Sequence, residues 1–242
     1  GMVELDSGAL AAMRRAVGIA ARAKMTKELY PTFARVLLVN GHFRAFNGRV
    51  GIVVYANIDP AAGSLSLPAD RLHAFLTAMG MDAHPVILSV NVQDDTSQLS
   101  FGSSILSFEG AVYKEEVHQL PGQLPKQDAY VDLSDGFMPA LKAAVFSSSE
   151  DMMKIMFYGV QVRTIVGGRS SFGAVYSTDG LRVTRAEFAG ALPKALDGVF
   201  LPRYLCDDLV SQGTAPKGVA GDTAGNRLWF NFEDAVLYGQ LI

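Results

Sequence analysis

Apolar and polar positions alternate along the chain with two different periods, which predicts helices separated by groups of strands. Near the N-terminus four apolar residues recur at spacings of three and four: Leu10, Met13, Val17 and Ala21. This spacing places them on one face of a helix. Asp6 or Ser7 stands where a helix-capping side chain is expected, so the sequence predicts a helix that begins there.

The pattern then changes to period two over three short segments, 36–39, 43–46 and 50–55. Asn40-Gly41 and Asn47-Gly48 separate them, and Asn-Gly supplies the positive φ that tight hairpins need. The sequence therefore predicts a three-stranded antiparallel meander. The same signal predicts further strands, through Val86 to Val92, Leu99 to Phe101, Ile105 to Phe108, Tyr158 to Val162, Val175 to Tyr176 and Leu181 to Val183.

The two halves of the chain repeat one another. Three pairs of segments match in the same order, each about 130 positions apart: Leu5-Asp6-Ser7-Gly8 with Leu133-Ser134-Asp135-Gly136, Leu67-Pro68 with Leu201-Pro202, and Leu99-Ser100-Phe101 with Leu228-Trp229-Phe230. Pro68 and Pro202 stand where the first turn of a helix tolerates proline. Three anchors at nearly one offset indicate an internal duplication, the alternative being coincidence between Leu- and Ala-rich helices.

Each half reads as strand–helix–three strands written twice. Four such units cover the chain, near residues 3–58, 64–112, 129–190 and 198–242. The stretch from Tyr113 to Asp128, rich in proline, glycine and charge, has the composition of a linker. We therefore expect two similar domains, 1–120 and 121–242, in an α+β design with helices on one face of antiparallel sheet.

Composition limits the classes of function. Apolar residues make up 49% and charged residues 19% of the 242 residues, as in folded globular proteins. No run reaches the roughly 18 apolar residues that a membrane span needs, so no membrane partner is expected. The single cysteine, Cys206, allows no internal disulfide and favours a reducing cytoplasm. A net charge of −3 means that any contact with nucleic acid must come from a local patch.

Catalytic patterns are weak, and we expect neither an enzyme nor a cofactor or metal site. The histidines are scattered without zinc-site spacing: His42, His73, His84 and His118. Gly213 to Gly218 has the glycine spacing of a phosphate-binding loop, but Val219 stands where its lysine belongs. Asp94-Asp95 and Asp207-Asp208 are interpreted as surface pairs, and Cys206 as a small core residue.

Three segments resemble the bacterial DNA polymerase III beta subunit, the DNA sliding clamp. They are Ser177-Thr178-Asp179-Gly180-Leu181-Arg182-Val183, similar to the family's Thr-Asp-Gly-His-Arg-Leu turn, Leu201-Pro202-Arg203, which opens a helix, and Leu237-Tyr238-Gly239-Gln240-Leu241-Ile242. The resemblance extends over essentially the whole chain. It implies the DNA clamp (processivity) fold and a processivity factor that encircles duplex DNA without sequence preference and without catalysis.

The resemblance also implies an assembly. The beta subunit has three such domains per chain and closes as a dimer, whereas two-domain clamps, including phage ones, close as trimers. We therefore expect a homotrimeric ring, in a phage- or prophage-like version of the family. The alternative is a clamp-fold binding module or decoy that does not encircle DNA, and ring closure distinguishes the two.

In this family the helices line the hole, so basic helix residues are candidates for contact with the DNA backbone. Residues 7–27 contain five basic residues and no acid, and the later helix segments contribute further basic residues. The candidates are Arg14, Arg15, Arg22, Lys24, Lys27, Arg71, Lys142 and Arg203. The alternative for the first helix is an ordinary solvated face.

The second site implied by the resemblance is a pocket for short apolar peptide motifs of a DNA polymerase and a clamp loader. Carried over residue by residue, it consists of Thr178, Gly180, Leu181, Arg182, Val183 and Pro202. Leu181 replaces the family's usual histidine. The alternative for Asp179-Gly180 is a plain hairpin turn.

Overall fold

The computed structural model describes residues 1–21, 31–60, 63–79, 85–109, 123–222, 224 and 226–242. The chain forms two compact units, Gly1–Gly122 and Gln123–Ile242. Within the described residues, no helix is long and apolar enough to span a membrane.

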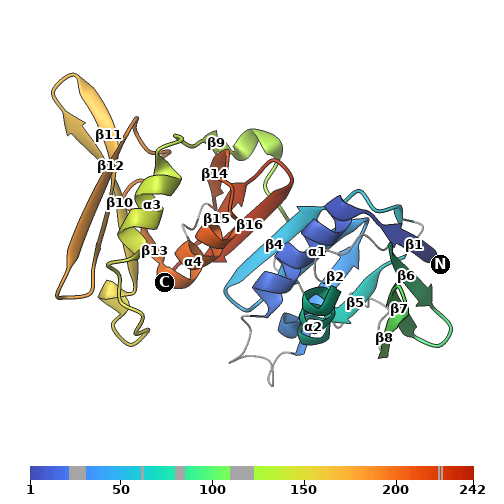
Figure 1. The fold of residues 1–242 in the computed structure, drawn as a ribbon. Coiled ribbons are helices and arrows are strands. Elements are labelled where there is room, and N and C mark those ends of the chain that lie inside the picture. The colour runs from blue at the N-terminus through green and yellow to red at the C-terminus, as the bar shows by residue number, and fades with distance from the viewer. Residues whose placement is uncertain (22–30, 61–62, 80–84, 110–122, 223, 225) are drawn as a thin grey trace. The chain divides into compact units, whose positions relative to one another are not determined.

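The first unit contains the predicted strand–helix–three-strand order twice (Figure 1). Its first repeat consists of β1 (Met2–Leu5), α1 (Ser7–Ala20), β2 (Arg35–Val39), β3 (His42–Phe46) and β4 (Val50–Tyr55). Its second repeat consists of β5 (Leu65–Pro68), α2 (Ala69–Met79), β6 (Val86–Asn91), β7 (Thr96–Phe101) and β8 (Ser104–Glu109). A short 3-10 helix, η1 (Pro31–Ala34), precedes β2.

The second unit follows the same order. Its first repeat consists of β9 (Val131–Asp132), α3 (Phe137–Val145), β10 (Gly159–Gly167), β11 (Ser170–Thr178) and β12 (Val183–Ala189). Its second repeat consists of β13 (Phe200–Pro202), α4 (Arg203–Ser211), β14 (Gly218–Gly221), β15 (Arg227–Asn231) and β16 (Ala235–Gln240). Two 3-10 helices, η3 (Gln127–Ala129) and η4 (Ile155–Phe157), lie between these elements. The predicted fold class is thereby confirmed.

Within each unit the two repeats interlock through their first strands. In the first unit the strand orders are β1-β6-β7-β8 and β5-β2-β3-β4, and in the second they are β12-β11-β10-β13 and β16-β15-β14-β9. Each meander therefore receives its fourth strand from the other repeat, and the pairs of both units are antiparallel. Because each sheet needs strands from both repeats, a single repeat cannot complete a sheet by itself.

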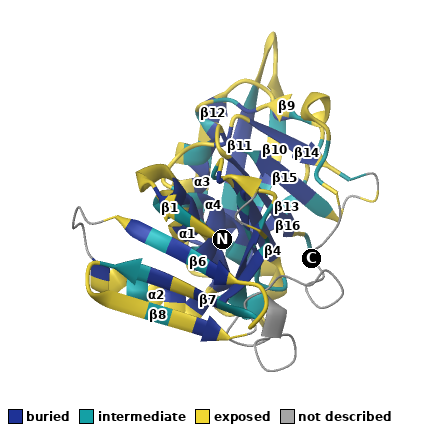
Figure 2. Cartoon of the chain, turned by 90° about the vertical axis from the view of Figure 1, so that its right-hand side faces the viewer, coloured by how far each residue is buried: buried dark blue, intermediate teal, exposed yellow. Residues whose placement is uncertain are grey.

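Helix α1 packs on β2, β3 and β4, and α3 packs on β10, β11 and β12 (Figure 1). The side chain of Asp6 caps α1 by accepting a hydrogen bond from the Ala9 amide at 2.7 Å. The buried face of α1 differs from the predicted stripe, because Leu10 is half-buried and Ala21 is exposed. Alanines make up most of the observed face and allow close approach to the sheet, and the buried residues are Ala9, Ala12, Met13, Ala16, Val17, Ile19 and Ala20. Strands β2 and β4 beneath α1 are largely buried (Figure 2).

The first predicted hairpin turn has the expected left-handed geometry. Asn40 has φ of 53° and Gly41 φ of 77°. A Cβ on Gly41 would lie 2.2 Å from the Ile58 carbonyl oxygen, so only glycine fits this turn.

Several predicted boundaries need correction. Val92 lies in the turn after β6 and is exposed, and Leu181 lies in the turn before β12. Pro68 and Pro202 end strands β5 and β13 instead of starting the helices, which begin one residue later. A strand-terminal position suits proline because no further ladder donor is needed there. Most of the predicted linker, 113–122, lies outside the described residues, and 127–129 forms η3.

Candidate functional site

Large apolar side chains are unusually exposed in one region of the second unit. They belong to the connection between α3 and β10, to the turn before β12 and to the first position of β12: Phe146, Met152, Met153, Ile155, Met156, Leu181 and Val183. Met156 is 85% exposed and Leu181 95%. Contiguous exposed apolar surface of this kind is typical of interaction sites.

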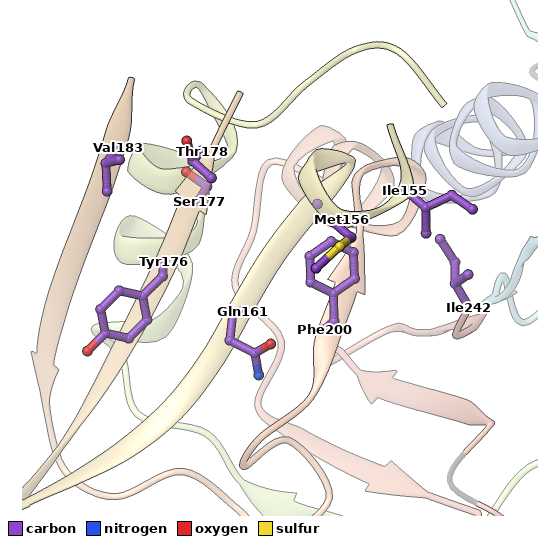
Figure 3. A pocket seen from close by; sticks show the side chains of 10 residues that line it. Ile155, Met156, Gln161, Tyr176, Ser177, Thr178, Val183, Phe200 and Ile242 are labelled. Atoms are coloured by element: carbon purple, nitrogen blue, oxygen red, sulfur yellow. The ribbon is translucent and has the colours of Figure 1, made fainter. Parts of the chain in front are cut away.

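A cavity of about 440 Å³ lies beside these residues, on the sheet formed by β12, β11, β10 and β13 (Figure 3). Its walls are mostly apolar, with a few polar groups that can fix the orientation of a ligand. It is lined by Ile155, Met156, Gly159, Gln161, Tyr176, Ser177, Thr178, Val183, Phe200 and Ile242.

A second, more polar cavity of about 260 Å³ is lined mainly by the connection between α3 and β10 and by the turn between β11 and β12. Lys154 lines it next to Ile155 of the larger cavity, and Asp179 lines it next to Thr178. Its other lining residues are Phe146, Ser148, Ser149, Glu150, Leu181, Arg182 and Arg203.

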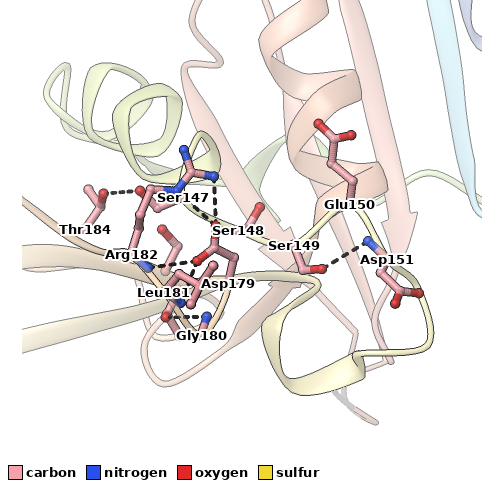
Figure 4. Close-up of polar contacts among 12 residues, drawn as sticks. Ser147, Ser148, Ser149, Glu150, Asp151, Asp179, Gly180, Leu181, Arg182 and Thr184 are labelled. Carbon is pink, nitrogen blue, oxygen red and sulfur yellow. Dashed lines mark hydrogen bonds and ion pairs between the residues drawn. The ribbon is translucent and has the colours of Figure 1, made fainter.

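Asp179 organises the turn between β11 and β12 (Figure 4). Its Oδ1 accepts hydrogen bonds from the amides of Leu181 and Arg182, both at 2.8 Å. Its Oδ2 accepts two more from the Arg182 guanidinium, at 3.0 and 2.8 Å. The backbone amides of Arg182 and Leu181, and then the Arg182 side chain, hold the pKa of the Asp179 carboxyl far below its usual range.

The guanidinium of Arg182 also lies over the Phe146 ring, 4.9 Å from its centroid. Gly180 adopts φ of 94°, which favours glycine at this turn position, and its amide donates to Thr178 Oγ1 at 3.0 Å. The turn is therefore held by its own side chains, and it leaves Leu181 exposed at its tip.

The structure divides the predicted pocket residues between the two cavities. Thr178 and Val183 line the larger cavity, whereas Leu181 and Arg182 line the smaller one. Gly180 and Pro202 are among the lining residues of neither, and Pro202 is buried at the end of β13. Leu181 thus lies on the more polar of the two cavities, and the predicted pocket as a set stays a prediction.

Sequence reasoning missed most of the larger cavity, notably Ile155, Met156, Phe200 and Ile242. A signal for part of it was present. Met152, Met153, Ile155 and Met156 form an apolar cluster without helical or strand period, and methionine-rich surfaces adapt to varied partners.

The predicted basic residues differ in their exposure and in their contacts. Arg14, Arg71 and Lys142 are exposed on α1, α2 and α3, and Arg15 is half-buried. Arg14 donates to the Leu76 carbonyl oxygen of α2 at 3.5 Å, and Arg71 lies 5.2 Å from the Phe108 ring centroid. Helix α1 is described from Ser7 to Ala20. Arg22, Lys24 and Lys27 lie outside the described residues.

Arg203 is engaged within its own unit. Its Nη1 donates to the Ser148 carbonyl oxygen at 2.7 Å, its Nη2 lies 3.3 Å from Glu150 Oε1, and its Nε lies 3.5 Å from Asp207 Oδ2. The side chain is 15% exposed. These contacts join the start of α4 to the segment after α3, where Arg203 forms part of the wall of the smaller cavity.

Hydroxyl and ionisable groups line the smaller cavity, among them Glu150, Lys154 and Asp179. Among the described residues, no cluster of three or more His, Cys, Asp or Glu side chains could hold a metal ion. Cys206 is buried, and desolvation raises the pKa of its thiol strongly, so it remains protonated.

The architecture defines the class of the fold. Two units, each a twice-repeated strand–helix–three-strand motif with helices on one side of antiparallel sheet, constitute the DNA sliding-clamp fold. No protein-family model matches the chain, and no curated protein matches it by sequence.

Solved structures identify the fold more closely. The whole chain superposes on the DnaN sliding clamp (DNA polymerase III subunit beta) of Bartonella birtlesii bound to griselimycin, with a TM-score of 0.78 and 19% identity. The corresponding values are 0.75 and 20% for Caulobacter crescentus pol III beta, and 0.74 and 15% for the Thermotoga maritima DNA polymerase III beta subunit. The chain covers 64%, 65% and 64% of these three chains. The predicted resemblance to the beta subunit is confirmed at the level of the fold.

Proposed function

We propose that this chain is a DNA sliding clamp, a processivity factor that encircles duplex DNA and tethers replication proteins without catalysis. The observation that carries the proposal is the superposition of the full chain on beta-subunit clamps at a TM-score of 0.78. Its setting is the cytoplasm, which the single buried cysteine also favours.

The ring is proposed to close through two strands that are unpaired on one side within the described residues. In the first unit β8 pairs only with β7, and in the second unit β12 pairs only with β11. An unpaired edge presents backbone donors and acceptors for another strand. Joining β8 of one copy to β12 of the next is a heterologous contact, which forms a ring if the rotation closes. Three copies supply six clamp domains, the number in the dimer of three-domain beta subunits.

DNA contact is proposed for the exposed cations of the helices. Arg14, Arg71 and Lys142 lie on three different helices with exposed side chains. Such residues act on phosphates without reading sequence, and their contribution falls as salt rises. The predicted set also includes Arg15, which is half-buried on α1, and Arg22, Lys24 and Lys27, which lie outside the described residues. The contacts of Arg203 favour a role within the unit.

The larger cavity is proposed to bind a short peptide of a polymerase or clamp loader by two or three apolar anchors. Burial of each anchor contributes roughly 1.5–3 kcal/mol, before the cost of ordering the peptide. The expected affinity is on the order of micromolar, about −8 kcal/mol.

Native mass spectrometry of the assembled protein tests the ring. The 25.9 kDa chain is expected to give a homotrimer that dissociates on dilution. A monomer at every accessible concentration contradicts the ring and leaves the alternative, a clamp-fold module that binds clamp partners without encircling DNA.

A further inference from the structure

The larger cavity extends across its sheet to the unpaired edge. The strand order is β13-β10-β11-β12, and each strand contributes a wall: Phe200 from β13, Gln161 from β10, Tyr176 and Thr178 from β11, and Val183 from β12 (Figure 3). In the described part of the chain, β12 has no strand on its other side. The cavity therefore ends on this side at Val183, whose side chain is 78% exposed.

The edge strand of the first unit, β8, has a pattern of exposed and buried residues similar to that of β12. On β8, Ile105, Ser107 and Glu109 are exposed, while Phe108 between them is buried. On β12, Val183, Arg185 and Glu187 are exposed, while Phe188 is buried. Each edge strand thus presents one exposed aliphatic residue, Ile105 or Val183, on the face away from its core.

Charge gives little net preference for contact between the two strands. The outward face of β8 carries the carboxylate of Glu109 and no base. That of β12 carries Arg185 and Glu187, whose side chains already form an ion pair with each other at 2.5 Å. If the buried faces of both sheets lie on the same side, the exposed residues of β8 continue the surface on which the cavity lies.

We propose that the peptide site is built by two copies of this chain, with β8 of the neighbouring copy adding to β12 and the neighbour's Ile105 closing the cavity beside Val183. The proposal rests on the proposed function, because ring closure brings the second strand to the site. The ligand is a short peptide segment whose apolar anchors contact both copies.

Coupling follows from this arrangement. A peptide that contacts both copies binds the ring more tightly than the separated chain, so it must also shift assembly toward the ring. Burial of one aliphatic side chain against the peptide corresponds to an affinity difference of about tenfold or more.

Complementation between two variants tests the shared site. The first variant, Ile105→Lys with Ser107→Lys, has a charged β8 edge that disfavours strand addition and keeps every cavity residue of its own chain. The second, Val183→Asp, has an intact β8 and a damaged cavity. The probe is a fluorescein-labelled hexapeptide with a leucine and a phenylalanine as apolar anchors, followed by fluorescence anisotropy.

Each variant alone is expected to bind the probe at least about tenfold more weakly than the unmodified chain. An equimolar mixture is expected to regain near-normal affinity, because the second variant supplies β8 to the intact cavity of the first. Val92→Lys is the matched control, since Val92 is 66% exposed in the same unit but lies outside β8. This control is expected to bind normally.

The possible outcomes separate the two proposals. If the β8 variant remains monomeric and binds the probe as tightly as the unmodified chain, the shared site is refuted while the ring stands. If that variant binds weakly and the mixture does not recover, the substitutions act within their own chain and the shared site is again refuted. An unmodified chain that never assembles refutes the ring itself. Should the β8 variant fail to fold, titrating the probe into the unmodified chain above and below its assembly concentration gives the same test.

Discussion

At the scale of single residues, Asp179 illustrates how one carboxylate can hold a binding rim in place. Both of its oxygens are engaged, one by two backbone amides and the other by the Arg182 guanidinium. The exposed tip residue Leu181 therefore stands on a turn of fixed geometry. Rigid support of this kind lowers the entropy that a binding partner must otherwise overcome.

The turn is expected to resist acid. Because the folded pKa of Asp179 is depressed, its stabilising effect is present above the ordinary value of 3.8 and is lost only as the pH falls toward the lowered value. An NMR titration of the Asp179 carboxyl carbon is expected to show no inflection near pH 3.8. In Arg182→Ala the pKa should rise only in part, because the backbone amides are the larger cause. An ordinary Asp179 titration in the unmodified chain contradicts the observed hydrogen bonding.

Two substitutions distinguish the cavities as the peptide site. Met156→Asp places a charge in the wall of the larger cavity and is expected to weaken binding of an apolar-anchored peptide by about tenfold or more. Leu181→Asp changes the polar cavity, and its effect should be several times smaller. Isothermal titration calorimetry measures both. A larger loss of affinity for Leu181→Asp than for Met156→Asp would indicate that the apolar anchor of the peptide binds at the turn and not in the larger cavity.

At the scale of elements, Arg203 connects the start of α4 to the segment that follows α3. Its hydrogen bonds reach Ser148, and its charge lies near Glu150 and Asp207. Helix position alone suggested that Arg203 faces DNA. The contacts indicate that it positions α4 against the wall of the smaller cavity.

Arg203→Met is expected to lower stability, whereas Lys142→Met is expected to affect DNA binding and leave stability almost unchanged. Arg203→Met removes charged hydrogen bonds from a nearly buried side chain, so the second unit should lose about 1.5–3 kcal/mol of stability. Lys142→Met, on an exposed position, should change stability by less than about 0.5 kcal/mol and lower the salt dependence of DNA binding. Trp229, the single tryptophan, is buried in the second unit and reports its unfolding in urea. Unchanged stability with weaker DNA binding in Arg203→Met would restore its predicted role.

The order of the elements could be predicted because its signals are local. Asn40-Gly41 specifies a tight turn by its backbone conformation, and Asp6 specifies a helix start by its side chain. The buried face of α1 was harder to predict from the sequence. Its alanines are small enough to lie against the sheet, and only the packing shows that they, and not Leu10, face it.

The larger cavity could be predicted only where it adjoins the turn between β11 and β12. Thr178 and Val183 belong to a recognisable segment, whereas Phe200 and Ile242 reach the cavity from strands and ends far along the chain. Their convergence depends on the strand order β12-β11-β10-β13, which no local pattern specifies. The same limit explains Arg203, whose partners Ser148 and Glu150 lie more than fifty positions away.

At the scale of the whole molecule, the proposed clamp holds DNA by topology and not by tight local contacts. The chain is acidic overall, with a net charge of −3, and its proposed DNA contacts are a few exposed cations on helices. Such contacts are weak at physiological salt. Long residence on DNA therefore requires a closed ring.

Retention on circular and linear DNA tests this claim most directly. The protein is loaded at high concentration on a nicked circular plasmid, and the complex is separated by gel filtration at high salt, before and after a restriction enzyme cuts the plasmid once. The account predicts that the protein stays with the circular plasmid and is lost from the linear one, and that blocking the ends of the linear plasmid restores retention. Equal loss from circular and linear plasmids would contradict encirclement.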